Sequence, residues 1–250
     1  MPIEIISLLP ESLVRHLPVL IVVIPMLTSP LAAAMPSWRV SWGLVLAASV
    51  ISFICAFGLV EITFSGERLS YALGGWAPPL GIEFVVDQMN SPILLLVSFI
   101  GLLATLYAMP TMVKEIPEAK RSLFLAAYVL CFAGLLGVAV TGDAFNLFVF
   151  LEISSISTYV LVALGGNQDR RAFTAAFNYL IMGSLGATFY VIGIGFLYAA
   201  TGTLNMADLA TRVPEVADSR TIHAGFAFIV VGLGLKFAMF PLHQWLPNAY

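Results

Sequence analysis

The run "AFNLFVFLEISSISTYVLVAL", residues 144–164, holds a single charged side chain, that of Glu152. A membrane-spanning helix needs roughly 20 mainly apolar residues, so a run of this length is sufficient to cross a bilayer. A charge at the centre of the bilayer costs about 2.5–3.5 kcal/mol on insertion scales, which makes contact of a carboxylate with lipid unfavourable. The run therefore predicts a transmembrane helix whose glutamate faces the protein interior.

The composition of the whole chain agrees with a membrane protein. Hydrophobic residues make up 60% of the 250 residues and charged residues 10%, whereas soluble domains are about half apolar and a quarter charged. The net charge is −3, and no cluster of lysine or arginine indicates nucleic-acid binding. Cys55 and Cys131 lie in separate apolar runs and have no metal-ligand spacing, so we interpret them as small buried residues.

Further apolar stretches predict an all-α integral membrane protein, a bundle of about seven transmembrane helices. The segment 65–90 differs from them, because turn-forming residues surround the short β-branched run "IEFVVD", and it predicts a small external β-hairpin between the second and third helices. We expect helices 1–3 with the hairpin to occupy residues 1–113 and helices 4–7 to occupy residues 114–250. The seven predicted spans cover residues 17–35, 41–63, 91–113, 122–141, 145–165, 172–201 and 222–246.

The basic residues of the connections predict the orientation of the bundle. The first, third and fifth connections hold six basic residues in total, against four on the opposite side of the membrane. Because basic connections favour the cytoplasm, we expect the N-terminus outside and the C-terminus inside. A signal peptide cleaved after Ala34 is an alternative, but Glu4, Glu11 and three prolines in the leader disfavour it.

A second buried charge of opposite sign accompanies Glu152. The last predicted span contains Lys236, the only lysine inside an apolar run of the chain. Two isolated charges would each carry an insertion cost, whereas a pair offsets part of it, although desolvation can exceed the attraction. We therefore expect Glu152 and Lys236 to face each other, directly or through water. The alternatives are a protonated Glu152 bonded to a backbone carbonyl and a Lys236 that extends to a headgroup.

Polar groups follow both charges. Pro241 removes a backbone donor after Lys236 and predicts that the last span is broken there. His243, two residues further on, is of the type that most readily exchanges a proton near neutral pH, although a histidine at a helix break is often purely structural. The hydroxyls that could hold a short chain of water after Glu152 are those of Ser154, Ser155, Ser157 and Thr158.

Enzymatic motifs are missing from the sequence. No HExxH or GxSxG motif is present, and His223 and His243 lie at opposite ends of one predicted span, too far apart to share a metal. The sequence "TGD" that ends at Asp143 has no second intramembrane aspartate with which to form a protease dyad. We therefore expect no cofactor, no metal and no redox or hydrolytic chemistry in this chain.

Two segments resemble a known family. "FVFLEISSISTYVLVAL" and "GLKFAMFPLHQWLPNAY" are similar to the antiporter-like subunits shared by Mrp-type multisubunit cation/proton antiporters and respiratory complex I. The resemblance implies a buried glutamate on the fifth core helix and a buried lysine on a broken seventh helix, which here are Glu152 and Lys236. The hairpin "GGWAPPLGIEFVVD" and the ending "NAY" look most like the Mrp antiporter component of D type.

This resemblance implies a proton-translocating subunit of a Na⁺/H⁺ antiporter, multi-pass in a bacterial-type inner membrane, whose partners are other membrane subunits. Proton transfer would use Glu152, Lys236 and His243, with the hydroxyls, Pro241 and Asp143 in support. One alternative is a proton-pumping subunit of an NADH:quinone oxidoreductase or hydrogenase-type complex, in which other subunits perform the redox chemistry. Another is a non-conducting scaffold, because family members are about twice as long. The chain is then a fragment, or the remainder is supplied elsewhere.

Overall fold

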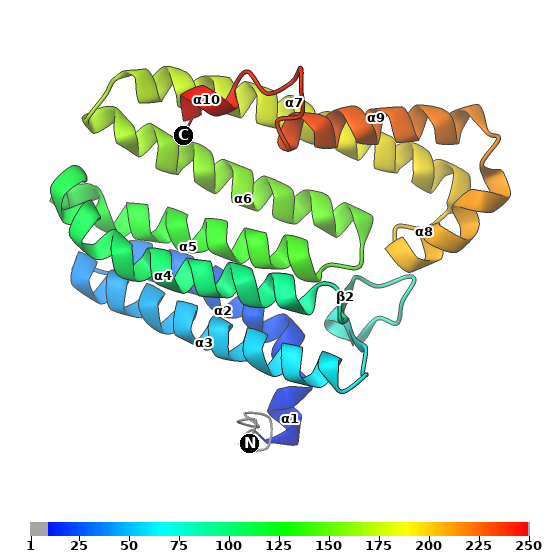
Figure 1. Ribbon diagram of the computed structural model, residues 1–250, viewed down its shortest axis with the longest axis horizontal. Helices are drawn as coiled ribbons and strands as arrows, with labels where there is room; N and C mark the ends of the chain where they lie inside the picture. The colour runs from blue at the N-terminus through cyan, green and yellow to red at the C-terminus, as the bar shows by residue number, and fades with distance from the viewer. Residues whose placement is uncertain (1–9, 250) are drawn as a thin grey trace. The chain divides into compact units, whose positions relative to one another are not determined.

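The computed structural model describes residues 10–249 of the chain, most of them in helices (Figure 1). Glu4 and the N-terminal end lie outside the described residues. The predictions about signal-peptide cleavage and about the side of the N-terminus depend partly on them. The main helices are α2 (Leu17–Ala34), α3 (Trp38–Phe64), α4 (Ser91–Glu115), α5 (Glu118–Val140), α6 (Ala144–Leu164), α7 (Arg171–Thr201) and α9 (Arg220–Lys236). The short helices are α1 (Glu11–Val14), α8 (Met206–Arg212) and α10 (Leu246–Ala249).

The membrane class of the fold is confirmed. Within residues 10–249, six helices, α2 to α7, are long and apolar enough to cross a bilayer. The seventh expected span, α9, has 17 residues and is therefore shorter than the others. The predicted all-α bundle with a small hairpin agrees with this arrangement.

The helices fall into two compact units. Helices α2 to α5 form the first unit, and residues 72–83 together with the chain from Thr141 onward form the second. The predicted boundary between residues 113 and 114, which divides the N-terminal helices from an incomplete first antiporter-like repeat, stays a prediction. Both charged residues of the expected pair, Glu152 and Lys236, belong to the second unit.

In the first unit, hydroxyl and ring N–H groups join neighbouring helices. Ser29 on α2 donates to the carbonyl of Ala126 on α5 over 2.9 Å, and Tyr128 on α5 donates to the carbonyl of Gly101 on α4 over 2.6 Å. Trp42 on α3 donates its indole N–H to the carbonyl of Thr105 over 3.0 Å. Such bonds hold helices together where lipid offers no hydrophobic driving force between them.

The predicted hairpin is present between α3 and α4. Strand β1 (Leu69–Ala72) pairs with β2 (Glu83–Val86), and between them η2 (Leu73–Gly75) turns the chain through Gly74 at φ 65°. Gly74 and Gly75 both have positive φ, which glycine adopts without steric cost and which explains the "GG" of the turn.

The second unit begins with a junction of three chain segments. The amide of Gly142 donates to the carbonyl of Glu83, and the amide of Met206 donates to the carbonyl of Gly142. The side-chain amide of Asn205 also donates to the Glu83 carboxylate over 2.7 Å. These bonds connect the start of α6, the hairpin tip and the segment before α8 at one end of the unit.

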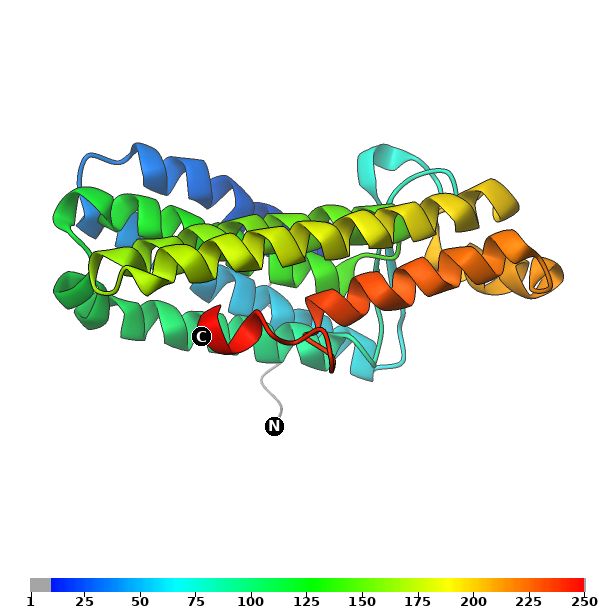
Figure 2. The ribbon, with the colours of Figure 1, turned by 90° about the horizontal axis from the view of Figure 1, so that it is seen from above.

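Helices α7 and α9 run side by side in both views of the unit (Figures 1 and 2). Glycines allow their backbones to approach closely. A Cβ added at Gly232 of α9 would lie 2.7 Å from the carbonyl oxygen of Gly186, and one added at Gly193 of α7 would lie 2.6 Å from that of Gly225. Small residues at such positions are typical of tight helix pairs in membranes.

The break in the last span comes earlier than the sequence predicts. Helix α9 ends at Lys236, residues 237–245 are not helical, and α10 follows, whereas we expected a helix that continues to Pro241. Ala238 has φ 51°, in the left-handed region, so the helical path is left well before the proline. Proline disfavours helical backbone in the residue directly before it. This effect accounts for residue 240 but not for the other non-helical residues between Lys236 and Pro241.

Candidate functional site

Helix α6 places Glu152 near its middle. Asp143 caps the helix, because its side chain accepts a hydrogen bond of 2.7 Å from the amide of Asn146. From this cap the helix continues without interruption to Leu164, and Glu152 is its ninth residue. The side chain of Glu152 is 22% exposed.

Helix α9 places Lys236 at its last position, next to Glu152. The ammonium nitrogen Nζ of Lys236 lies 2.7 Å from Oε1 of Glu152, and the lysine side chain is 6% exposed. A cation at the C-terminal end of a helix is also favoured by the helix dipole. The structure thus brings together the two charged residues that the sequence singled out, and their role in proton transfer stays a prediction.

Ser155 completes the immediate surroundings of the lysine. Nζ of Lys236 donates a second hydrogen bond, of 2.8 Å, to Oγ of Ser155. Glu152 and Ser155 are three residues apart on α6 and therefore lie on one face of the helix. The ammonium group accordingly has one charged and one neutral acceptor, both from α6.

The electrostatic attraction within the pair is substantial. At an effective dielectric constant of about 20, two unit charges 2.7 Å apart attract each other by about 6 kcal/mol. Desolvation of the nearly buried lysine opposes this term, so the net contribution of the pair to stability is much smaller. Removal of one partner, in contrast, leaves the other charge uncompensated.

The other predicted hydroxyls are directed toward the backbone of their own helix. Ser154 donates to the carbonyl of Leu151, Ser157 to that of Ile153, and Thr158 to that of Ser154, over 3.0, 2.6 and 2.8 Å respectively. Serine and threonine inside helices commonly bond to the preceding turn in this way. Their participation in a water chain stays a prediction, and Ser155 is the hydroxyl that contacts Lys236 directly.

The turn after α9 is held by a residue that the sequence analysis did not single out. The carbonyl of Leu235 accepts the indole N–H of Trp245 over 3.1 Å, and the Trp245 side chain is buried. Carbonyls at the end of a helix have no partner within the helix, so this bond satisfies one of them. The signal in the sequence was the tryptophan within "HQWLP", which we used for the resemblance but not for the site.

His243 and Pro241 lie in exposed turns after the break. The imidazole ring of His243 lies 5.6 Å from the ring of Phe240, measured between centroids. Within residues 10–249, no hydrogen bond joins His243 to Glu152 or Lys236. His243 therefore has no direct bond to the pair, and its role in proton transfer stays a prediction.

Asp143 occupies the start of α6, about 13 Å along the helix axis from Glu152 at a rise of 1.5 Å per residue. Burial raises the pKa of the Asp143 carboxyl, and the hydrogen bond from the Asn146 amide partly opposes this shift. Tyr190 of α7 donates to the carbonyl of Ala144 over 3.1 Å and packs beside this helix start. Asp143 thus belongs to the end of the unit rather than to the charged pair.

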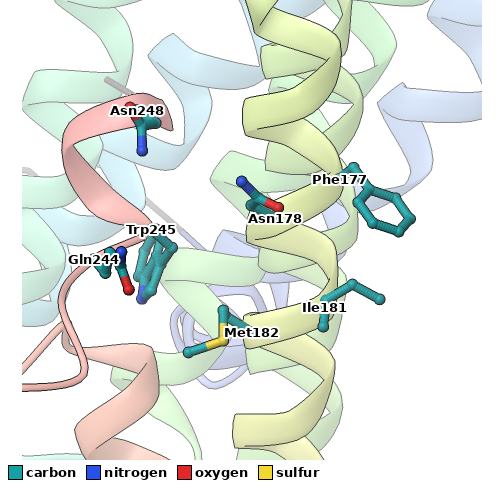
Figure 3. Close-up of a pocket in the computed structure, with 7 residues that line it drawn as sticks. All are labelled: Phe177, Asn178, Ile181, Met182, Gln244, Trp245 and Asn248. Carbon is teal, nitrogen blue, oxygen red and sulfur yellow. The ribbon is translucent and has the colours of Figure 1, made fainter.

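A cavity opens beside the turn that follows α9 (Figure 3). It has a volume of about 340 Å³ and lies between α7 and the C-terminal segment. In Figure 3, Asn178 and Met182 extend from α7 toward the segment that carries Gln244, Trp245 and Asn248. Within the described part of the chain, no group of three His, Cys, Asp or Glu side chains is arranged to bind a metal.

Comparison with known proteins gives the family of this region. Residues 141–250, which hold the pair, match the family described as "NADH:quinone oxidoreductase/Mrp antiporter, TM". This segment belongs to that family. The resemblance inferred from the sequence is confirmed.

Relatives of two kinds match almost the whole chain. It is 47% identical to the N component of the NADH-quinone oxidoreductase of Desulforudis audaxviator, over 94% of this chain and 47% of the relative. It is 35% identical to the D component of the Na⁺/H⁺ antiporter of Bacillus subtilis, over 82% of this chain and 40% of the relative. The chain thus spans about half the length of the relatives it matches.

Two solved structures have the same fold. A chain of the archaeal membrane-bound sulfane sulfur reductase, a respiratory membrane complex, is 28% identical with a TM-score of 0.85, over 94% of this chain and 47% of that chain. A chain of the Mrp complex from Dietzia sp. is 26% identical with a TM-score of 0.82, over 96% of this chain and 44% of that chain. Antiporter-type and respiratory complexes therefore both contain structural relatives of this chain.

Proposed function

We propose that this chain is the proton-translocating subunit of a multisubunit Na⁺/H⁺ antiporter. The observation that carries the proposal is the contact between Nζ of Lys236 and Oε1 of Glu152, 2.7 Å long and largely buried within a helical membrane bundle. Intramembrane ionisable residues are costly and commonly belong to ion pathways. The similarity to the antiporter component of Bacillus subtilis supports cation exchange as the driving process.

In the proposed mechanism, Glu152 and Ser155 hold the proton on Lys236 while the three groups are in contact. If the charges separate from 2.7 to about 8 Å, the attraction at an effective dielectric constant of about 20 falls from about 6 to about 2 kcal/mol. The loss of about 4 kcal/mol shifts the protonation equilibrium of the lysine roughly a thousandfold toward release. Neutralisation of Glu152 by a proton would have a similar effect. The released proton would then pass to water near the turn that holds Pro241 and His243.

The surroundings of the chain follow from the same proposal. Its partners would be the other membrane subunits of the antiporter, because the relatives are subunits of larger complexes. The chain would lie in a bacterial-type inner membrane with its C-terminal end on the cytoplasmic side, as the basic connections indicate. The exchanged cation would bind oxygen ligands, and this chain contributes Asp143 near one end of α6.

A second function has its own support. The relative with 47% identity is a subunit of an NADH-quinone oxidoreductase, and the reductase chain of similar fold belongs to a respiratory complex. In such a complex, redox chemistry in other subunits would drive the same proton movement through Glu152 and Lys236. The two candidates differ in the energy source and not in the chemistry of the pair.

The test uses everted vesicles that contain the complete native complex. A proton gradient is imposed without any reductant, sodium is added, and dissipation of the gradient is followed for the wild type, Lys236→Ala and the control Lys114→Ala. Lys114 is an exposed lysine in the last turn of α4, so its replacement makes the same chemical change away from the pair. Sodium-dependent dissipation that is lost only in Lys236→Ala supports the antiporter.

A wild type without any sodium response overturns the antiporter proposal. The same vesicles then receive NADH, reduced ferredoxin or hydrogen, and proton uptake is recorded. Uptake that depends on Lys236 supports the redox-driven complex. A Lys236→Ala complex that assembles and transports like the wild type in both assays contradicts proton translocation through this residue and supports a scaffold role.

A further inference from the structure

Tyr159 on α6 has a buried hydroxyl without a partner. The residue is 6% exposed, and within residues 10–249 its hydroxyl oxygen makes no hydrogen bond of acceptable geometry. An unpaired buried hydroxyl is unfavourable, so its presence requires an explanation such as a mobile water or a functional role.

The position of Tyr159 connects it to the charged pair. Ser155 accepts a hydrogen bond from Lys236, and Tyr159 follows Ser155 by four residues, which places it one turn further along the same face of α6. Long side chains on a helix lean toward its N-terminus, so the phenol of Tyr159 is directed back toward Ser155. Lys236, Ser155 and Tyr159 therefore form a row of groups that carry exchangeable protons.

Helix α7 leaves space for the Tyr159 hydroxyl. A Cβ added at Gly183 would overlap the Tyr159 oxygen, so any residue larger than glycine at this position would displace it. The neighbouring residue, Met182, lines the cavity shown in Figure 3. A volume of about 340 Å³ holds several water molecules, and the carboxamides of Asn178, Gln244 and Asn248 in its lining can bond to them.

Aromatic contacts fix the ring of Tyr159. Its centroid lies 4.7 Å from that of Tyr179 with an edge-on angle of 78°, and Tyr179 stacks on Trp245 at 4.2 Å and 12°. Trp245 in turn bonds to the carbonyl of Leu235, the residue before Lys236. The phenol is thus held in place by its ring, while rotation about the C–O bond leaves its proton free to change direction.

We propose that Tyr159 relays protons between Lys236 and the water of this cavity. A proton on Nζ of Lys236 passes to Oγ of Ser155 as the serine proton passes to the Tyr159 oxygen, and the tyrosine proton passes to a water that approaches past Met182. Each hydroxyl loses one proton and gains one, so both stay neutral, and the net change moves one proton from the lysine to the cavity. Met182 is unbranched and adaptable, so its movement can admit that water. The relay rests on the proposed proton translocation and adds a route to it.

The experiment compares Tyr159→Phe with Tyr190→Phe in vesicles that contain the complete complex, with rates normalised to the amount of assembled complex. Tyr159→Phe retains the ring contacts and removes only the hydroxyl. Tyr190→Phe removes another buried tyrosine hydroxyl of the same unit, bonded to a backbone carbonyl and outside the relay. We expect Tyr159→Phe to lower transport roughly tenfold to a hundredfold and to change its solvent deuterium isotope effect, and Tyr190→Phe to do neither.

Lys236→Ala in the same vesicles separates the relay from the proposed function. Loss of transport in Lys236→Ala together with wild-type transport in Tyr159→Phe overturns the relay and leaves the proposed function intact. Wild-type transport in both variants overturns both. Gly183→Ala gives an independent check of the geometry, because its Cβ meets the Tyr159 oxygen. We expect Gly183→Ala to lower the amount of assembled complex and the additional change Tyr159→Phe to restore part of it. An equally low amount of assembled complex in the double variant also contradicts the relay geometry.

Discussion

Glu152→Gln isolates the charge of the pair, because the amide has nearly the same size and shape as the carboxylate. At 2.7 Å and an effective dielectric constant of about 20, the substitution removes about 6 kcal/mol of attraction for the protonated lysine. A hydrogen bond from the ammonium group to the new amide oxygen returns about 1.5–3 kcal/mol. The net loss of at least about 3 kcal/mol corresponds to a factor of more than a hundred in an equilibrium constant.

We therefore expect Glu152→Gln to reduce transport about a hundredfold while the complex still assembles. The rate is measured as dissipation of an imposed proton gradient in everted vesicles, or as substrate-driven proton uptake if the complex is redox-driven. Glu152→Asp should give an intermediate rate, because a side chain shorter by one methylene moves the charges to about 4 Å, where the attraction is about 4 kcal/mol. The transport rate should therefore decrease in the order wild type, Glu152→Asp, Glu152→Gln, because the attraction for the lysine decreases in that order.

Glu215→Gln is the matched control, because it makes the same chemical change on an exposed side chain of the same unit. Its rate should equal that of the wild type. A Glu152→Gln complex that assembles normally and transports within a factor of two of the wild type would refute the reasoning, and the pair would then be a structural ion pair.

Three further predictions concern the surroundings of the pair. Ser155→Ala removes the neutral acceptor of Lys236, a bond that contributes about 1.5 kcal/mol, and should lower the vesicle transport rate roughly tenfold without loss of assembled complex. Gly232→Ala places a Cβ against the backbone of α7 and should lower the melting temperature of the detergent-solubilised complex, whereas Gly195→Ala, with open space around it, should not. Burial raises the pKa of Asp143, so its contribution to stability is present below the ordinary value of 3.8 and is lost as the pH rises through the raised value. Asp143→Asn keeps a capping side chain but cannot ionise, so its melting temperature should fall less than that of the wild type as the pH rises from 4 to 7.

The helices and the charged pair could be predicted from the sequence because both depend on local chemistry. Apolar runs of sufficient length have few alternatives to a membrane helix, and buried charges of opposite sign have few alternatives to each other. The sequence did not show which of the four hydroxyls contacts Lys236, because a serine or threonine in a helix can instead bond to the backbone of that helix. The other three hydroxyls do so in the structure. The spacing of Glu152, Ser155 and Tyr159 on one helical face was a signal that could have ranked them.

The region after Lys236 could not be predicted in the same way. A proline indicates that a helix is interrupted nearby, but the residue at which the helix ends depends on which groups satisfy its last carbonyls. Here Trp245 provides one of the donors from ten residues away, and the helix ends at Lys236. The exposed position of His243 depends on the path of the same turn, so a sequence pattern alone did not determine it.

The glycine contact between α7 and α9 has a consequence for the speed of the proton step. Backbone packed on backbone at Gly186 and Gly232 leaves no side chain that could adjust, so α9 cannot slide or rotate on α7 without steric overlap. The stem of Lys236 also passes Gly186, where an added Cβ would lie 3.5 Å from the lysine Cγ. Separation of the charges would therefore come from side-chain torsions of Lys236 or Glu152 rather than from movement of α9 on α7. Such torsions are much faster than the microsecond-to-millisecond motions of whole helices, so under the proposed function a slower event elsewhere in the complex would set the turnover rate.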